Sequence, residues 1–415
     1  MGMYSCKHRT TTSSLPDNAW KCASKYTNNP LTFARFCTTI PGFLFSLLVM
    51  MYGHHDAVLV LSDGRHFFGK SLGERKSCIG EVCFTTGFTG YQYTITDPSF
   101  AGQIVVFSFP HIGNVGVNSK DFECEHVLAR GIVVREMSDA SHVSSLTDLN
   151  SWMKANGVSG ISGVDTRALT VHLREHGSQN GIIHCFDDPN LLNLQELKSI
   201  AMAPIAPPVA TELPHLKSYQ VSQTGPRVCV IDMGAKRGIM QALSALGCAV
   251  HVVAGRDDFV TQIMDLHPQG IVLSNGPGDP HDVPTDIIEQ LRVLLRRGIP
   301  ILGICLGHQL LAITIGAKTV KMRHGHRGSN HPVYNIMTRT VEVTSQNHGF
   351  AVDAQTLPEN AEVTHRSLFD GTIEGMRLLD YPALSVQYHP EGHPGPHDSH
   401  YIFKDFVNLA KAHEW

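Results

Sequence analysis

The sequence predicts an α/β protein with two domains: an amino-terminal mixed α/β domain, then a domain whose mostly parallel sheet is covered by helices on both faces. After residue 226, short apolar runs alternate with helical segments, and near-continuous apolar strands between helices are typical of buried parallel sheets. Before residue 203, β-type runs and helices occur without this alternation. The Pro-rich stretch Ala203–Pro208 separates the two patterns, because each proline fixes φ and removes a donor.

The elements of the first domain follow from short-range patterns. Apolar runs bounded by turn residues predict strands, and the turn at residues 62–65 joins two of them as a hairpin. The expected strands are 57–61, 66–69, 81–86 and 103–109, and the expected helices are 146–156 and 166–175. This region, residues 57–203, has the usual size of one domain.

The second domain, residues 226–415, follows a linker that we place at residues 204–225. Its expected strands are 227–232, 249–253, 270–274, 299–304 and 383–388, and its expected helices are 236–246, 259–266, 285–297 and 309–313. Ligands bind outside the carboxyl ends of parallel strands. Cys305 and the loop Asn275–Pro280 both follow such strand ends.

Residues 1–56 form an extension of different composition. Up to Tyr52 they contain five basic residues and one acidic residue, and they are rich in Ser and Thr. The apolar run Ile40–Tyr52 has 13 residues, too few to span a bilayer. The extension is either an organelle transit peptide or upstream sequence with the natural start near Met50 or Met51, and we favour the second interpretation. We therefore expect a cytoplasmic protein without membrane attachment, with a plastid or another organelle as the alternative.

The overall composition excludes several classes of protein. The chain has 33 basic and 37 acidic residues, a formal charge of −4, and no long basic run, so nucleic-acid binding has little electrostatic support. Its ten cysteines are scattered without a Cys-x-x-Cys pair, which argues against a zinc ribbon and favours a reducing compartment. Histidine is common, at 25 residues. The densest group, His324 and His326 with His331, matches no standard zinc spacing, so we expect no metal.

The segment Gly303–Gly307 predicts a nucleophile. Cys305 stands between two glycines at a strand-to-helix turn, which is the thiol version of the nucleophile elbow. Glycine allows the sharp turn and leaves room around the sulfur. The helix that starts beside the sulfur favours the thiolate over the thiol. An isolated cysteine is more often a core residue, but the flanking glycines favour an enzyme that attacks a carbonyl with sulfur.

A thiol nucleophile needs a base, and His389 is the best placed histidine. It follows the predicted strand 383–388, and Pro390 keeps the backbone at His389 extended. Residues i and i+2 of an extended chain point the same way, so Glu391 can orient the imidazole and stabilise its charged form. Cys305, His389 and Glu391 therefore form a candidate triad, since triads are defined by geometry and role.

The oxyanion of such a reaction needs hydrogen-bond donors. The backbone N–H of Leu306 follows the nucleophile and is the first candidate. The turn Gly276–Gly278 offers a second donor, most naturally the N–H of Gly278, because Pro277 has none. Taken alone, this Gly-Pro-Gly segment would be interpreted as a plain tight turn.

Three motifs, in this order, resemble the class I (triad) glutamine amidotransferase domain. They are Ser274–Pro280, Gly303–Gln309 and His389–Glu391, and the resemblance covers about residues 226–412. Further segments resemble the carbamoyl-phosphate synthetase small-chain family, including its amino-terminal domain, which other amidotransferases of the class lack. These segments are Thr89–Gln92, Thr96–Ser99, Pro110–Asn114, Val164–Thr170, Gly325–Pro332 and Gln346–Ala351.

The resemblance implies a substrate and a partner. L-glutamine would be hydrolysed to glutamate and ammonia, and the ammonia would pass to a large subunit that makes carbamoyl phosphate from bicarbonate and ATP, for arginine and pyrimidine biosynthesis. ATP and metal are expected on that larger partner and no cofactor on this chain, in which nothing resembles a P-loop. The positions that match the family's glutamine contacts are Ser99, Gly276, Gly278, Leu306, Gln309, Asn347, Gly349 and Phe350. Gln309 and Asn347 suit the amino-acid end of the substrate, and Ser99 would reach in from the first domain.

The chain departs from the family pattern at two places. Gly392 and His393 stand where Ala-Ser is usual, and Arg327 and Ser329 stand where His and Gly are usual. Neither departure removes a triad member. Three alternatives stay open at this level: an amidotransferase that serves anthranilate or guanylate synthesis, a thiol hydrolase that acts alone, and a catalytically silent regulatory subunit.

Overall fold

The computed structural model describes residues 55–205, 208, 210 and 225–413. The predicted extension, residues 1–56, lies almost wholly outside the described residues, and so does most of the predicted linker, residues 204–225.

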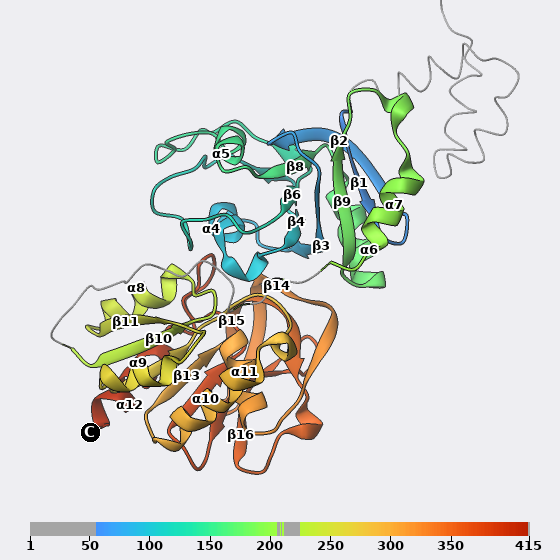
Figure 1. The fold of residues 1–415 in the computed structure, drawn as a ribbon. Helices are drawn as coiled ribbons and strands as arrows, with labels where there is room; N and C mark the ends of the chain where they lie inside the picture. Colours follow the sequence, from blue (N-terminus) through green and yellow to red (C-terminus); the bar gives the residue numbers. More distant parts are fainter. Residues whose placement is uncertain (1–54, 206–207, 209, 211–224, 414–415) are drawn as a thin grey trace, which may run out of the picture. The chain divides into compact units, whose positions relative to one another are not determined.

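The first region is built on a closed barrel, coloured blue to green in Figure 1. Its strands are β1 (Ala57–Leu61), β2 (His66–Gly73), β3 (Cys78–Thr85), β4 (Gln103–Phe107), β6 (Gly131–Val133), β8 (Ser159–Ser162) and β9 (Gln179–Cys185). They follow the order β1-β2-β8-β6-β4-β3-β9, with β9 pairing back onto β1. The four strands expected from the sequence, including the β1–β2 hairpin, are confirmed. The closing of these strands into a barrel was not predicted, because β6, β8 and β9 are short or rich in glycine and polar residues and so have no clear strand pattern in the sequence.

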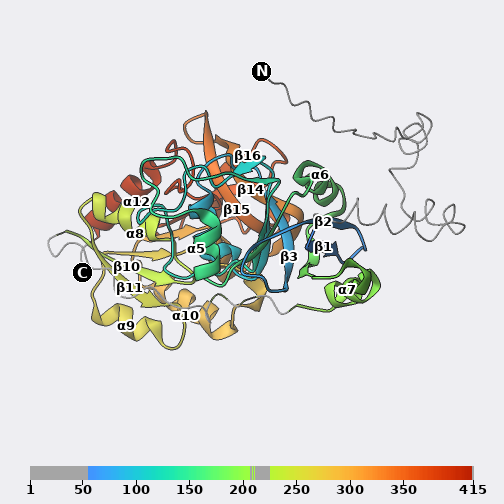
Figure 2. The same ribbon diagram turned by 90° about the horizontal axis from the view of Figure 1, so that it is seen from above.

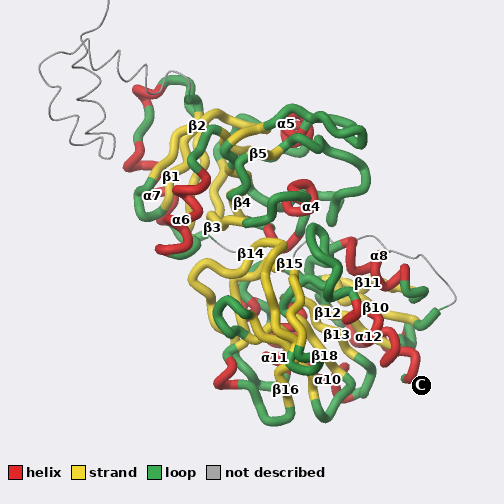
Figure 3. Tube along the Cα trace, turned by 180° about the vertical axis from the view of Figure 1, so that it is seen from behind, coloured by secondary structure: helices red, strands yellow, loops and turns green. Residues whose placement is uncertain are grey.

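The helices and short elements of this region cover the barrel and fill its connections. They are α4 (Tyr91–Thr96), η1 (Pro98–Phe100), β5 (His111–Ile112), β7 (Glu136–Met137), α5 (Leu149–Ala155), α6 (Thr166–His176), η2 (Pro189–Leu191) and α7 (Leu194–Met202). Helices α5 and α6 confirm the two expected helices, and each begins at an aspartate whose side chain accepts a backbone N–H of the first turn. Figure 3 shows that most of the chain between β4 and α5 is loop, coloured green.

The second region contains a nine-stranded sheet in the order β11-β10-β12-β13-β18-β17-β16-β14-β15. The first five strands are mutually parallel: β10 (Arg227–Asp232), β11 (Ala249–Ala254), β12 (Gly270–Leu273), β13 (Ile301–Ile304) and β18 (Ala383–Val386). All five expected strands are therefore confirmed. The other four strands pair antiparallel: β14 (Thr319–Asn335), β15 (Thr340–Val352), β16 (Ala361–Ser367) and β17 (Ile373–Leu378).

Helices cover both faces of the parallel strands, as the sequence predicted. They are α8 (Arg237–Ala245), α9 (Phe259–Asp265), α10 (Thr285–Arg296), α11 (Leu306–Thr314) and α12 (Tyr401–Ala412), with the short turns η4 (Pro280–Asp282) and η5 (Ala354–Thr356) in the connections. One core cluster joins the sheet to α9, α10 and α11, and a second joins it to α8 and α12. Figure 2 shows α9 and α10 on one side of β10 and β11, with α8 and α12 on the other.

The long strand β14 contacts the barrel region. Lys321 Nζ lies 3.1 Å from Glu81 Oε1 of β3, and the N–H of Thr86 donates to the carbonyl of Arg327 at 3.2 Å. These contacts bring the loop after β3, and with it α4 and η1, to the carboxyl ends of the parallel strands. Among the helices that the structure describes, none is long and apolar enough to cross a membrane.

Candidate active site

Cys305 occupies the turn between β13 and α11 in a strained backbone conformation. Its φ of 54° and ψ of −102° lie in a region that side chains rarely adopt, at a cost of about 1–3 kcal/mol. The glycines on either side allow this turn. A Cβ on Gly303 would lie 2.7 Å from the carbonyl oxygen of Gly307, and a Cβ on Gly307 would lie 2.2 Å from that of Leu273. The segment therefore has the geometry of a nucleophile elbow.

The sulfur of Cys305 lies at the wall of a cavity of about 380 Å³. Its Sγ is 3.6 Å from the carbonyl oxygen of Asn347, and Gln387 Nε2 is 3.7 Å from the sulfur. Seven of the eight residues expected to contact glutamine line the same cavity: Ser99, Gly276, Gly278, Gln309, Asn347, Gly349 and Phe350. A cavity of this size suits a small molecule.

His389 and Glu391 are joined directly. His389 Nδ1 lies 2.7 Å from Glu391 Oε1, and both side chains are buried. The backbone of His389 is fixed by its N–H, which donates to the carbonyl of Ser345 at 2.8 Å. Nδ1 faces the carboxylate, so Nε2 is the nitrogen left for proton transfer with the sulfur. His389 Nε2 finds no hydrogen-bond partner among the described residues in good geometry.

The electrostatics of this pair favour an imidazolium. Burial and the Lys236 charge lower the pKa of His389, but attraction to Glu391, the nearby Cys305 sulfur and the hydrogen bond to Glu391 outweigh them and raise the pKa to about 10. Burial would raise the pKa of Glu391, yet Lys236 and His389 hold it well below its ordinary value. The carboxylate is therefore ionised and the imidazole holds a proton at neutral pH.

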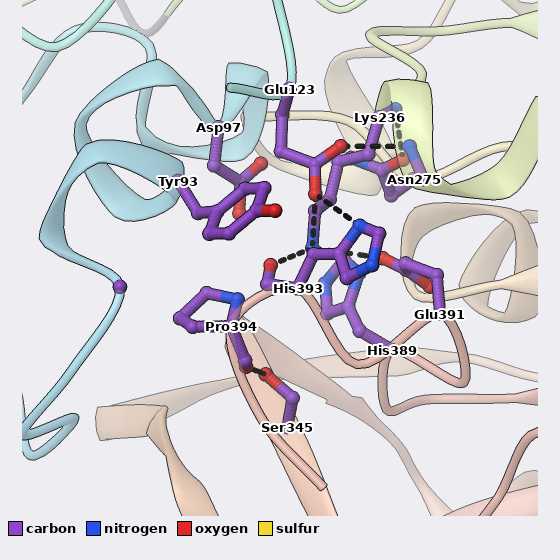
Figure 4. A network of polar contacts seen from close by, with 12 residues as sticks. Tyr93, Asp97, Glu123, Lys236, Asn275, Ser345, His389, Glu391, His393 and Pro394 are labelled. Atoms are coloured by element: carbon purple, nitrogen blue, oxygen red, sulfur yellow. Dashed lines mark hydrogen bonds and ion pairs between the residues drawn. The ribbon is translucent and has the colours of Figure 1, made fainter. Parts of the chain in front are cut away.

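Lys236 is a fourth member of this cluster that our sequence analysis did not predict. Its Nζ is buried, lies 2.9 Å from Glu391 Oε1 and donates to the carbonyl of His393 at 2.6 Å (Figure 4). Burial lowers the pKa of Lys236, but Glu391, Glu123 and Asp97 together raise it. A buried charge must be paired, and Lys236 Nζ shares Oε1 of Glu391 with His389 Nδ1. The available sequence clue was a lysine at the start of a helix, four residues after a strand end.

The first region reaches the cavity through η1. Asn275 Nδ2 donates to Ser99 Oγ at 2.8 Å, and Asn347 Nδ2 donates to Asp97 Oδ2 at 3.0 Å. Asp97 also caps η1 by accepting the N–H of Ser99 at 2.9 Å. Ser99 is therefore placed at the cavity, as expected. One N–H of the Asn347 amide is engaged by Asp97, which leaves its second N–H and Oδ1 for a ligand.

Gln309 is held by its own neighbours. Its Nε2 donates to the carbonyl of Phe350 at 2.9 Å and to Gln387 Oε1 at 3.0 Å. These bonds use only the nitrogen of the amide, so Oε1 can accept from a ligand ammonium. They also fix the carbonyl of Phe350 at the cavity wall.

The two candidate oxyanion donors come from different loops. Leu306 is the first residue of α11, and the first N–H groups of a helix have no acceptor within it. Gly278 has a φ of +92°, and a Cβ there would lie 2.7 Å from the carbonyl oxygen of Pro208. A Cβ on Gly276 would lie 2.8 Å from Leu306 Cδ2, so the Gly276–Gly278 turn packs directly against the elbow.

Among the described residues, one group of side chains could hold a metal ion: His326, His348 and Glu374 are buried, and their ligand atoms lie within 4.8 Å of one another. The contacts also describe an ion-pair network. His326 lies 3.0 Å from Asp370 and 3.3 Å from Glu374. Burial lowers the pKa of His326, but the two carboxylates raise it overall. The expectation that the chain binds no metal stays a prediction.

The departures from the family pattern lie near the site without displacing it. His393 Nδ1 is 3.3 Å from Glu123 Oε1, and its ring stacks on Tyr93 with centroids 5.1 Å apart. Arg327 lines the cavity, and its Nη1 donates to the carbonyl of His324 at 2.7 Å. Ser329 lies on β14, beside a small pocket that His389 also lines.

Comparison with known proteins agrees with this architecture. Residues 59–183 match the family model described as carbamoyl-phosphate synthase small chain, CPSase domain, and residues 229–409 match the model for glutamine amidotransferase class-I. A carbamoyl phosphate synthase small chain from Zymomonas mobilis is 45% identical, with 85% of this chain and 98% of that protein covered. The protein of the same name from Escherichia coli K12 is 43% identical, with 86% and 98% covered.

Among solved structures, a glutamine amidotransferase from Thermotoga maritima is 19% identical, with a TM-score of 0.33, covering 41% of this chain and 77% of that one. The small-chain model matches the first region and the amidotransferase model matches the second. The sequence similarity to the two small chains extends over 98% of the length of each relative. The chain therefore belongs to the carbamoyl phosphate synthase small chain family and carries a class I glutamine amidotransferase domain.

Proposed function

We propose that the chain is the glutaminase subunit of a carbamoyl phosphate synthase, with Cys305, His389 and Glu391 as its catalytic residues. The observation that carries this proposal is the elbow at Cys305, which opens onto a cavity lined by seven of the eight residues expected to contact glutamine. The membership of the small chain family supports glutamine as the substrate and, as the partner, a large subunit.

The reaction begins when the Cys305 sulfur attacks the side-chain amide carbon of L-glutamine, forming a C–S bond. The N–H groups of Leu306 and Gly278 stabilise the oxyanion. His389 gives its proton to the amide nitrogen, the C–N bond breaks, and ammonia leaves behind a thioester. His389 then takes a proton from water, the hydroxide attacks the thioester, and glutamate is released as the sulfur leaves.

Binding of the substrate uses the two ends of the cavity. Oε1 of Gln309 and the carbonyl groups near Gly349 and Phe350 suit the ammonium of the substrate, and Ser99 and Asn347 supply polar groups from the facing side. Ammonia then passes to the large subunit, which carries ATP and metal and makes carbamoyl phosphate from bicarbonate. We propose the cytoplasm as the location, with an organelle as the alternative if residues 1–56 are a transit peptide.

The test is Cys305→Ser in the complex with the large subunit, with Cys185→Ser as the matched control on the barrel. We expect the Cys305 variant to lose glutamine-dependent carbamoyl phosphate synthesis and to retain ammonia-dependent synthesis. The control should retain both. Glutamine hydrolysis at the normal rate by Cys305→Ser would overturn the proposal. Normal hydrolysis that does not respond to the large subunit would instead indicate a lone thiol hydrolase.

A further inference from the structure

Glu123 lies outside the cavity, on the loop that follows β5, and is nevertheless fully buried against the amidotransferase domain. Its own N–H donates to Thr96 Oγ1 at 3.0 Å, which ties it to the carboxyl end of α4. Its side chain points at the start of α8, as Figure 4 shows. A buried carboxylate needs partners, and those of Glu123 all come from the second domain.

The first partner is the amino terminus of α8. The N–H of Arg237 donates to the backbone carbonyl of Glu123 at 3.0 Å, and the N–H of Gly238 donates to Glu123 Oε2 at 2.8 Å. The helix has no side-chain cap of its own, because its N-cap residue is Lys236. A carboxylate at a helix amino terminus satisfies free N–H groups and the helix dipole. Glu123 thus supplies the missing cap from another domain.

The other carboxylate oxygen of Glu123, Oε1, faces two nitrogen atoms. Lys236 Nζ lies 3.7 Å away and His393 Nδ1 lies 3.3 Å away. Lys236 Nζ itself lies 2.9 Å from Glu391 Oε1, which in turn lies 2.7 Å from His389 Nδ1. The contacts therefore run without a gap from Glu123 through Lys236 and Glu391 to the catalytic imidazole.

Packing leaves this chain of contacts little freedom. A Cβ on Gly238 would lie 2.7 Å from His393 Nδ1 and 3.0 Å from Glu391 Cγ, so the first turn of α8 rests directly on Glu391. The charged and titratable groups around Lys236 are Glu391, Glu123, Asp97, Tyr93, His389 and His393. A displacement of Glu123 would therefore displace Lys236 or remove one of the negative charges that neutralise it.

We infer that Glu123 is a positioning residue of the glutaminase site: it caps α8, holds Lys236 against Glu391, and so lets the amino-terminal domain support the Glu391–His389 pair. The inference rests on the proposed glutaminase function and adds to it a residue outside the cavity. Lys236 by itself opposes the charged form of His389. Glu123 neutralises part of the Lys236 charge, so its carboxylate favours the imidazolium.

The experiment uses the variant Glu123→Gln in the full chain, in complex with the large subunit, with Glu125→Gln as the exposed control two residues away. The amide can still accept the N–H of Gly238 but carries no charge. We expect kcat for glutamine hydrolysis to fall about tenfold, equivalent to about 1.4 kcal/mol. KM should stay within about threefold, because Glu123 does not line the cavity. The alkaline limb of the kcat–pH profile should move about one unit toward lower pH.

A second comparison tests whether Glu123 acts through Lys236. In a Lys236→Met background, Glu123→Gln should cause no further loss of kcat, because the group that it holds is gone. If Glu123→Gln lowers kcat in the Lys236→Met background by the same factor as in the wild type, the inference is overturned. An unshifted alkaline limb for Glu123→Gln, or a kcat equal to that of Glu125→Gln, would overturn it as well. Glutaminase activity in Cys305→Ser would instead overturn the proposed function, so the two failures are distinguishable.

Discussion

Replacing Glu391 by Gln tests how the carboxylate supports His389. The substitution keeps the size of the side chain and removes its charge, so the amide oxygen can still accept the Nδ1–H of His389 now seen 2.7 Å from Glu391 Oε1. Burial and Lys236 both lower the pKa of His389. Without the carboxylate nothing of comparable strength opposes them, and the imidazole becomes neutral at physiological pH.

The magnitude follows from the pKa of His389, which stands at about 10 against an ordinary 6.5. This rise corresponds to about 5 kcal/mol in favour of the imidazolium. Loss of a positioned general acid costs on the order of 10²–10⁴ in rate. We expect kcat to fall within that range, and the alkaline limb of the profile to move by several pH units toward acid.

The assay is glutamate release by the purified complex between pH 5 and 10, with the melting temperature measured alongside. Glu391→Gln also leaves Lys236 buried with one carboxylate fewer, so some loss of stability is expected. The control is Glu362→Gln, an exposed carboxylate of β16 that pairs with Arg377. A folded Glu391→Gln variant with kcat within threefold of the wild type and an unshifted alkaline limb would refute the reasoning.

Three further predictions concern the elbow, the loop beside it and the pH dependence of stability. Gly307→Ala places a Cβ 2.2 Å from the Leu273 carbonyl, so urea unfolding should show a loss of about 1–3 kcal/mol and glutaminase activity should disappear. The control is Gly298→Ala, which has open space at its Cβ and a φ of +73°; it should lose stability through its backbone alone and keep its activity. Asn275→Ala leaves the buried Lys236 N–H and Gly234 carbonyl without the partners now at 3.0 and 2.9 Å, and should cost about 1–3 kcal/mol for each group; wild-type stability in this variant would contradict the packing. Because the pKa of His389 is raised on folding, its stabilising contribution is complete below pH 6.5 and lost as the pH rises through about 10. The difference in unfolding free energy between wild type and Glu391→Gln should therefore shrink over that interval, and a constant difference would argue against a charged His389.

Much of the fold follows from local patterns in the sequence. The parallel strands β10 to β13 and β18 are short apolar runs between helices, so periodicity alone locates them. The antiparallel half was not predicted. Strand β14 contains Gly, His, Arg, Ser and Asn, and its pairing with β15 has register shifts between Lys321 and His326 and between Gly328 and His331. Such a polar strand is held by its neighbours rather than by its own composition.

The residues of the candidate site also fall into two groups, those that local sequence patterns predict and those that only the structure reveals. Cys305, His389 and Glu391 could be predicted because each lies within two residues of a glycine or proline that shapes the local backbone. Lys236, Glu123 and Asp97 could not, since their roles depend on contacts between residues more than a hundred positions apart. Asn347 was expected to face the substrate, and only the structure shows that Asp97 accepts one N–H of its amide.

Covalent labelling tests the central claim most directly, namely that the sulfur of Cys305 attacks the side-chain carbonyl of bound glutamine. The purified chain would be treated with an electrophilic glutamine analogue, and the modified peptide would be identified by mass spectrometry. The account predicts one adduct, on Cys305, that excess L-glutamine prevents and that appears in step with the loss of hydrolysis. Complete inactivation with Cys305 unmodified, or full activity with Cys305 labelled, would contradict it.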